Sequence, residues 1–280
     1  MLLEMHAHTT YSRRMKVKYD GVSTPEEIIK AAKAANLDAI TITDHNTMYG
    51  YQKAKKYGKK YGVKVFPGEE ISSIDGHVIG FGINQQIRAG MTAEETIDKI
   101  HNQGGIAIAV HPFDLHNKGI KEKALKCDAT EMFNAINIER LSNIKARRFI
   151  MKNKLPYTAG SDAHSAEMVG RAVNDLDTTS IDSVIRSIKK RKNKLHTRYH
   201  PAMTIRNWAI RRVVLSDDHI KRYIENNYSG AKKHVSNKML SITRFGNDMD
   251  KLFSTLTYFS FYSAILYGLF KETKNFLNPR

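Results

Sequence analysis

Histidine and carboxylate side chains recur along the first 164 residues of this chain, at places where an apolar run begins or ends. Two pairs are spaced as alternate residues, His6 with His8 and Asp162 with His164. In a strand, residues two apart point to the same face, so each pair can hold one cation. Single candidates stand between the pairs: His45, Glu70, His77 and His111. Imidazole and carboxylate ligands together suit Zn, Mn or Fe, and the sequence therefore predicts a polynuclear metal site.

The elements that must position these ligands can be read from the apolar pattern. Runs typical of strands cover residues 2–8, 39–42, 63–67, 78–81, 106–110 and 155–159. Helical stretches alternate with them near 50–61, 139–153 and 180–192, and capping boxes at Thr24 and Thr92 predict two further helices. This alternation predicts an α/β fold with a largely parallel sheet, whose strand exits converge on one face.

A series of motifs, in order along the chain, resembles the polymerase and histidinol phosphatase (PHP) family. The motifs are His6-Ala7-His8-Thr9, Tyr19-Asp20-Gly21, Thr43-Asp44-His45-Asn46, Pro67-Gly68-Glu69-Glu70, Gly76-His77, His111-Pro112 and Gly160-Ser161-Asp162-Ala163-His164. The resemblance covers about residues 1–192 and is nearest to the short, free-standing phosphoesterases of the family, some of which act on nucleotides. It implies a distorted TIM-like barrel with three metal ions, and a metal-bound hydroxide that attacks phosphorus.

The resemblance also implies how the ligands divide among the cations. It gives His6, His8, Glu70 and Asp162 to the first cation, Glu70, His77 and His111 to the second, and Asp20, His45 and His164 to the third. The count from Pro67 selects Glu70 rather than Glu69 as the bridging ligand, and Glu69 is then expected to be a solvated neighbour.

Little work remains for protein acids and bases beyond protonating the leaving alkoxide. Asp44, Glu131 and His116 are candidates for that proton donor, and the sequence does not rank them. Arg171, which follows Gly170, resembles an arginine of the family that could clamp the phosphate; a surface ion pair is the alternative.

The chain departs from the family pattern in a basic insertion between Ser12 and Asp20. The insertion carries Arg13, Arg14, Lys16 and Lys18, where the family usually passes almost directly from the serine to Asp-Gly. Because the insertion lies between two groups of ligands, we expect it at the mouth of the site, where its charge attracts phosphate.

Positive charge is concentrated in the last hundred residues. Of the formal net charge of +17, residues 1–180 hold 25 Lys and Arg against 21 Asp and Glu, whereas residues 181–280 hold 20 against 7. We therefore predict a PHP metallophosphoesterase domain over 1–192 and a basic, helical C-terminal extension over 193–280. The basic tract could bind nucleic acid, with solvated helix surface as the alternative.

An uncharged apolar segment, 252–270, lies within the extension. Its nineteen residues could span a bilayer core of about 30 Å at about 1.5 Å per residue. Serine, threonine and tyrosine side chains dilute the segment, so a helix packed on the barrel or in a homodimer contact is the alternative. The single Cys127 and the absence of a signal-peptide pattern predict a cytoplasmic protein, with membrane association through 252–270 as an addition.

The ligand set favours a metal-dependent phosphoesterase acting on phosphomonoesters, in particular those of nucleotides or related small molecules. Two or three divalent transition metal ions, Mn, Zn or Fe, are the expected cofactors. Two other classes stay open: a nuclease trimming RNA or DNA ends, and a non-catalytic, metal-stabilised binding module. The binding module is disfavoured, because a structural metal site keeps no open coordination position and needs fewer ligands.

Overall fold

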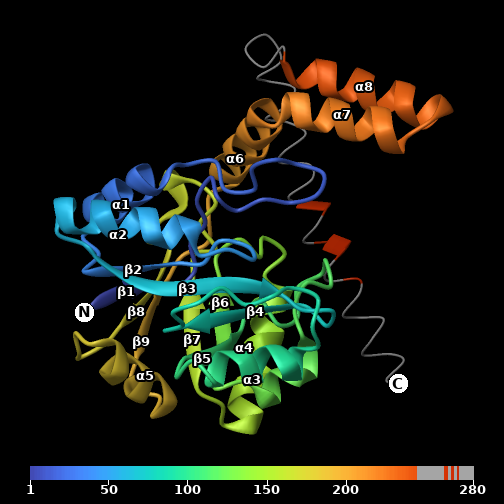
Figure 1. The fold of residues 1–280 in the computed structure, drawn as a ribbon. Helices are drawn as coiled ribbons and strands as arrows, with labels where there is room; N and C mark the ends of the chain where they lie inside the picture. The colour runs from blue at the N-terminus through green and yellow to red at the C-terminus, as the bar shows by residue number, and fades with distance from the viewer. Residues whose placement is uncertain (245–261, 264–265, 268–269, 271–280) are drawn as a thin grey trace.

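Strands separated by helices roll into a nearly closed barrel (Figure 1), in a computed structural model that describes residues 1–244, 262–263, 266–267 and 270. The nine-stranded sheet has the order β7-β6-β5-β4-β3-β2-β1-β8-β9. Its strands are β1 (Leu2–Glu4), β2 (Ala39–Ile42), β3 (Lys64–Ser72), β4 (His77–Phe81), β5 (Ile106–Ala109), β6 (Ala129–Asn134), β7 (Tyr157–Gly160), β8 (Ala172–Asp175) and β9 (Lys194–Thr197). The predicted α/β barrel is confirmed.

Most of the connections are helical. The α-helices are α1 (Pro25–Ala34), α2 (Tyr49–Tyr61), α3 (Ala93–His101), α4 (Leu141–Asn153), α5 (Ile181–Lys189), α6 (Ala202–Leu215), α7 (Asp217–Asn227) and α8 (Gly230–Arg244), with short 3-10 helices η1 (Lys121–Lys126) and η2 (Ala166–Met168). The capping boxes predicted at Thr24 and Thr92 are confirmed: each threonine side chain accepts a hydrogen bond from the backbone of the glutamate three residues on.

The prediction of a largely parallel sheet is wrong: β8 runs antiparallel to both β1 and β9, and parallel pairing is confined to two groups of strands. Strands β1, β2 and β3 are parallel to one another, as are β5, β6 and β7, whereas β4 runs antiparallel to both of its neighbours. Residues 73–76 join β3 to β4 in a turn in which Ser73 and Gly76 bond each other, too short for the crossover that parallel strands need. The start of β4 therefore lies at the same edge as the ends of its neighbours.

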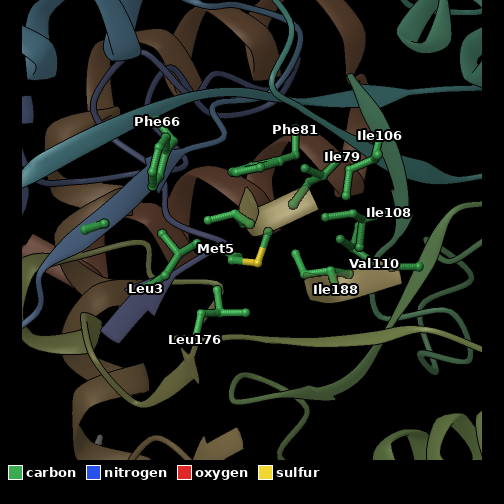
Figure 2. Packing of buried hydrophobic residues seen from close by; sticks show 13 residues of the cluster. Leu3, Met5, Phe66, Ile79, Phe81, Ile106, Ile108, Val110, Leu176 and Ile188 are labelled. Carbon is green, nitrogen blue, oxygen red and sulfur yellow. The ribbon is translucent and has the colours of Figure 1, made fainter. Parts of the chain in front are cut away.

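The interior of the barrel is filled with large apolar side chains (Figure 2). Alternation along β5 shows how this core forms: Ile106 and Ile108 belong to the interior cluster, while Ala107 and Ala109 pack in the cluster that includes α3. Val184 and Ile188 of α5 join the interior cluster. In Figure 1, α5 lies at the lower left beside β9, so the apolar core lies toward this helix.

Asparagine side chains join β7 to β8, where the ring of strands closes. Asn174 of β8 accepts from the backbone N–H of Ala159 at 3.1 Å and donates to its carbonyl at 2.7 Å. Asn193 donates to the carbonyl of Tyr157 at 2.8 Å and to Asn174 Oδ1 at 3.3 Å. We call this contact the seam; in it, side-chain amides take the place of a backbone ladder.

Helices α6 to α8 lie beyond the barrel, at the end opposite α5 (Figure 1). β9 pairs with β8 although it follows residue 192, and the division of the chain at that residue stays a prediction. Most of the apolar segment 252–270 lies outside the described residues; Tyr262, Leu266, Tyr267 and Phe270 are described and are exposed. Among the residues that the structure describes, no helix combines the length and apolar character needed to cross a membrane.

Candidate metal centre

The predicted ligands converge at one end of the barrel because each follows, opens or ends a strand at that edge. His6 and His8 follow β1, His45 follows β2, and His111 follows β5. Isolated bridges tie these segments together, pairing Ala7 with Ala163 and His45 with Glu70. The strand predicted over 2–8 is shorter than expected, since regular pairing ends at Glu4 and only Ala7 pairs again.

One group of ligands surrounds the two histidines of the first motif. His8 Nε2 lies 3.2 Å from Glu70 Oε2 and 3.2 Å from Asp162 Oδ1. His6 Nε2 lies 3.3 Å from the same oxygen of Asp162 and 3.5 Å from Glu70 Oε2. Two imidazoles and two carboxylates therefore face one small volume, as the sequence predicts for the first cation.

Glu70 stands at the centre of the cluster. Its Oε1 lies 2.7 Å from His77 Nδ1 and 3.2 Å from His111 Nε2, and its Oε2 lies 3.0 Å from His45 Nδ1. The carboxylate thus faces two sets of imidazoles through its two oxygens. That arrangement is the one expected of a bridging ligand.

The cluster fits divalent cations by its unsatisfied atoms. Several buried atoms of the ligands that face the cluster have no hydrogen-bond partner among the described residues: His6 Nε2, His8 Nε2, His45 Nδ1, His77 Nδ1 and Glu70 Oε2. Buried polar atoms are normally paired, so this many orphans in one place point to a missing partner. Three groups have ligand atoms within 4.8 Å of one another: His6, His8 and Glu70; His45, Glu70 and His77; and His8, His45 and His164.

The charges of the cluster are consistent with cation binding. Although burial opposes ionisation, the imidazoles of His45 and His77 hold the pKa of Glu70 well below its usual range. Burial lowers the pKa of His45 to about 3, so the ring is neutral. Against the effect of burial, Asp162 and Glu70 raise the pKa of His8 to about 9, so a cation binding there would displace a proton.

The third predicted group, Asp20, His45 and His164, is arranged differently. Asp20 Oδ2 lies 3.3 Å from His45 Nε2 and 3.4 Å from His164 Nε2, so these residues do come together. However, two guanidinium groups already contact the carboxylate: Arg14 Nε bonds Oδ2, and Arg212 Nη1 bonds Oδ1 at 2.8 Å. The imidazoles of His45 and His164 belong to a group with His8 that could hold a cation, but a cation bound through Asp20 would have to displace both guanidinium groups.

Two of the predicted proton donors lie behind the ligands. Glu131 bonds His6 Nδ1 at 3.0 Å through one oxygen, and its other oxygen accepts from the backbone of His111 at 2.8 Å. Asp44 accepts from the backbone and hydroxyl of Thr9 at 2.6 and 2.7 Å. Both carboxylates are buried and fully engaged, which fits residues that orient ligands rather than donors of a proton to substrate.

The other two predicted catalytic residues differ in their placement. His116 is exposed and lines a cavity of about 380 Å³ together with His77, His111 and Asp162. Arg171 lies elsewhere: it lines a separate cavity with Glu167 and Arg198. The structure thus brings His116 to the cluster and does not bring Arg171 there.

The basic insertion borders the cluster, as predicted. Arg13, Arg14 and Lys16 line a cavity of about 880 Å³ that also includes His45 and His77. Arg14, Lys118 and Arg212 line both this cavity and the smaller one. Positively charged side chains therefore surround the entrance to the ligand cluster.

Strained backbone marks the ligand loops. His111 and Asp162 have φ angles of 32° and 51°, in a region that residues other than glycine seldom adopt. Such strain is typical of functional sites, where the surrounding structure enforces it. Gly160 is also required: a Cβ there would lie 2.2 Å from Glu131 Oε1 and 2.5 Å from His6 Cβ.

Several supporting residues are absent from the sequence prediction. Ser12 bonds His8 Nδ1 at 3.0 Å, and Asn134 donates to Asp162 Oδ2 at 3.1 Å. Asn134 ends a strand, and the predicted ligands also lie at strand ends, so its position could have indicated a role at the site. Trp208 and Arg212 come from α6 and have no local signal, because only the fold brings them to Asp20.

The prediction that Glu69 is solvated is wrong. Its side chain is fully buried, and Oε2 accepts from the backbone of Ile87 at 2.9 Å. Burial raises the pKa of Glu69 to about 7. The residue faces away from Glu70 because neighbours in a strand point to opposite sides, and here the opposite side is covered by residues near 87.

Comparisons with known proteins identify a matching family model and relatives of this chain. A family model described as PHP-associated matches residues 140–193. The uncharacterized protein MJ1587 of Methanocaldococcus jannaschii is 39% identical over 165 residues, which are 57% of this chain and 96% of the relative.

Solved structures with the same fold have low sequence identity. A two-domain protein from Bacteroides vulgatus, described as containing a predicted PHP-like metal-dependent phosphoesterase, superposes with a TM-score of 0.57 at 15% identity, over 70% of this chain and 64% of that one. An amidohydrolase from Chromobacterium violaceum, solved with bound sulfate and no metal, gives a TM-score of 0.51 at 16% identity, over 66% of this chain and 96% of that one.

The barrel and its ligand cluster define the fold class of the PHP-like metal-dependent phosphoesterases and amidohydrolases. The chain belongs to the PHP family.

Proposed function

We propose that this protein is a metal-dependent phosphoesterase that hydrolyses phosphomonoesters, with nucleotides or related small molecules as its substrates. The observation that carries the proposal is the convergence of histidine and carboxylate atoms that have no partner among the described residues, beside two cavities lined by basic side chains. A cluster of ligands that opens to a cavity has room for substrate, which a closed structural site lacks.

Two ligand groups are suited to hold divalent cations, namely His6, His8, Glu70 and Asp162, and Glu70 with His77 and His111. When bound, such cations supply Lewis acidity, which neutralises phosphate oxygens and lowers the pKa of water from about 15.7 towards 7. Glu131 orients His6, and Ser12 orients His8, through hydrogen bonds to the Nδ1 atom of each ring.

Basic side chains at the entrance would bind and orient the phosphate. Arg14, Lys118 and Arg212 border both cavities, and a guanidinium can present paired N–H groups to phosphate oxygens. His116 borders the smaller cavity at its exposed side, where it could protonate the leaving alkoxide. Arg171 as a phosphate ligand has no support from the cavities at the cluster.

Metal content and turnover test the proposal together. Protein loaded with Mn or Zn is expected to retain bound metal and to hydrolyse p-nitrophenyl phosphate. His8→Ala or Asp162→Ala should lower turnover by about 10³-fold, since metal catalysis contributes several kcal/mol and each 1.36 kcal/mol is tenfold. His196→Ala is the matched control, because His196 is an exposed histidine that bonds Asp175 outside the cluster.

A protein that binds no metal and stays inactive after addition of Mn or Zn contradicts the proposal. For an active protein, a screen over nucleotides, bisphosphates, sugar phosphates and short oligonucleotides would define the substrate class. An anilide substrate belongs in the screen, because one protein of similar fold is an amidohydrolase.

Trimming of RNA or DNA ends is the second candidate function. It is favoured by the basic entrance and by the arginines of α6, Arg206, Arg211 and Arg212. A nuclease that binds several phosphates should lose affinity for oligonucleotides steeply as salt rises, whereas a mononucleotide should depend on salt only weakly. Equal salt dependence for the two substrates contradicts this second function.

A further inference from the structure

We propose that the guanidinium groups of Arg14 and Arg212 take the place of a third metal ion, so that this chain holds two divalent cations beside a fixed pair of positive charges. The inference rests on the metal binding of the proposed function. It concerns Asp20, His45 and His164, which the family resemblance assigns to a third cation.

The carboxylate of Asp20 is already paired with two positively charged side chains. Asp20 is 1% exposed, and a buried carboxylate must be paired. Arg14 Nε bonds Oδ2, and Arg212 Nη1 bonds Oδ1 at 2.8 Å. Both oxygens that could bind a metal thus accept from guanidinium groups.

The imidazole of His45 is engaged in the same way. Its outward nitrogen, Nε2, lies 2.8 Å from Nη2 of Arg14, at hydrogen-bond geometry. Its other nitrogen, Nδ1, lies 3.0 Å from Glu70 Oε2. Arg14 therefore bridges Asp20 and His45 across the position that a cation would have to share with them.

This pairing sets the third group apart from the rest of the cluster. Nε2 of both His6 and His8 and Oε2 of Glu70 have no hydrogen-bond partner among the residues described. Both oxygens of Asp20 and Nε2 of His45 are instead bonded to guanidinium groups. A divalent ion would need the same lone pairs and would lie beside two like charges, which repel it.

The two arginines are held in position by contacts between distant parts of the chain. The carbonyl of Met15 accepts from His219 Nε2 at 3.0 Å, and the backbone of Tyr19 donates to Ser216 Oγ at 3.1 Å, so α6 and α7 fix the insertion. Trp208 Nε1 donates to the carbonyl of Asp20 at 2.8 Å, and the guanidinium of Arg212 lies 4.6 Å from the Trp208 ring centroid.

Two guanidinium groups in place of a third metal ion would change the chemistry of this position. A guanidinium attracts phosphate oxygens and stays charged at all accessible pH values, but it cannot activate water by coordination. Arg14 and Arg212 are partly exposed and border both cavities, so their remaining N–H groups face substrate. They would bind the phosphate, while the two cations at Glu70 supply the Lewis acidity.

Metal stoichiometry of the full-length protein tests the inference without using activity. The chelator-treated protein is loaded with excess Mn²⁺, desalted, and measured by elemental analysis and native mass spectrometry. We expect two Mn per wild-type chain, three in Arg14→Met/Arg212→Met, and two in the control Arg13→Met/Arg211→Met. The control changes neighbouring arginines that are exposed and do not contact Asp20.

Asp20→Asn provides a second test that leaves both arginines in place. If Asp20 is not a ligand, this variant should hold as many Mn as the wild type. Three Mn in the wild type, a loss of Mn in Asp20→Asn, or an unchanged count in Arg14→Met/Arg212→Met each overturns the inference alone. No Mn in any of the proteins overturns the proposed function as well.

Discussion

At the scale of single residues, Gly160 allows β7 to approach the metal ligands closely. Gly160→Ala would drive a methyl group into Glu131 and His6, since its Cβ would lie 2.2 Å from Glu131 Oε1. We expect a loss of about 1–3 kcal/mol of unfolding free energy and of about 10- to 100-fold in metal affinity. Thermal denaturation and Mn titration measure the two effects.

Gly62→Ala separates backbone strain from contact with the ligands. Gly62 has a φ of 70°, and a Cβ added there would meet open space among the described residues. Alanine at this position should therefore cost stability and leave metal affinity unchanged. If both variants lose stability and neither loses metal affinity, Gly160 has no part in positioning His6.

His200 is buried in its neutral form. Its Nε2 donates to the carbonyl of Ser161 at 2.7 Å, and its Nδ1 has no partner within the described part of the chain. Burial lowers the pKa of His200 from 6.5 to about 4, against the attraction of Asp162. A depressed pKa means that the unfolded state binds the proton more tightly, so His200 stabilises the fold fully above pH 6.5 and loses that contribution as the pH falls towards 4.

We expect wild-type stability to fall relative to His200→Gln by up to about 3 kcal/mol between pH 7 and pH 4, since each pKa unit is 1.36 kcal/mol. The comparison cancels other groups that titrate in both proteins. Urea unfolding at several pH values measures it. Parallel stability curves for the two proteins would show that His200 does not titrate as its burial requires.

Much of the candidate site could be predicted from residue types and spacing. His6 and His8 share a face because they alternate, and the distance from Pro67 selects Glu70. The partners of Asp20 could not be predicted, because Arg212 lies 192 residues away and only the fold brings it near. The burial of Glu69 could not be predicted for the same reason: its cover comes from residues near 87.

At the scale of elements, the contribution of the seam between β7 and β8 to stability can be tested. Asn174→Ala removes both bonds to Ala159 and leaves a buried backbone donor and acceptor unpaired. We expect a loss of about 2–4 kcal/mol, at about 1–3 kcal/mol for each buried unsatisfied group and with partial relaxation. Amide hydrogen exchange at Ala159 should also quicken.

Asn153→Ala is the matched control for the seam. Asn153 bonds only the carbonyl of Phe149 at an exposed position, so its loss should change stability by less than about 0.5 kcal/mol. An Asn174 variant as stable as this control would mean that the seam contributes little to holding the barrel closed.

The elements themselves followed from local sequence signals. The two capping boxes begin α1 and α3, since their side chains satisfy the first free N–H groups of each helix. The direction of β4 could not be read, because alternation of apolar residues is the same in a parallel and an antiparallel strand. The helix predicted over 180–192 is shorter, ending at Lys189, because Arg191 adopts a left-handed conformation.

At the scale of the whole molecule, a truncation can separate the helices of the C-terminal extension from its apolar segment. Truncation after Asn247 keeps α6 to α8, including the contacts of Trp208 and Arg212 with Asp20, and removes 252–270. We expect the truncated protein to keep its metal and its phosphatase activity and to lose any attachment made by the apolar segment.

Fractionation distinguishes the two kinds of attachment that the sequence predicts. Full-length protein that pellets with membranes, resists high salt and is released by detergent supports a membrane anchor. A dimeric full-length protein and a monomeric truncated one support a homodimer contact. Loss of activity on truncation would show that 252–270 is needed by the barrel.

The bond between Asp20 and Arg212 also fixes the order in which the site can be completed during synthesis. A ribosome adds residues at about 5–20 per second, from the N-terminus onwards. His6, His8 and Asp20 are therefore made early, but β1 lacks its neighbour β8 until residues 172–175 have emerged, and Asp20 lacks one guanidinium until α6 has followed. The nascent chain thus exposes its first ligands for most of translation, and the last helices to emerge finish the loop that was among the first to be made.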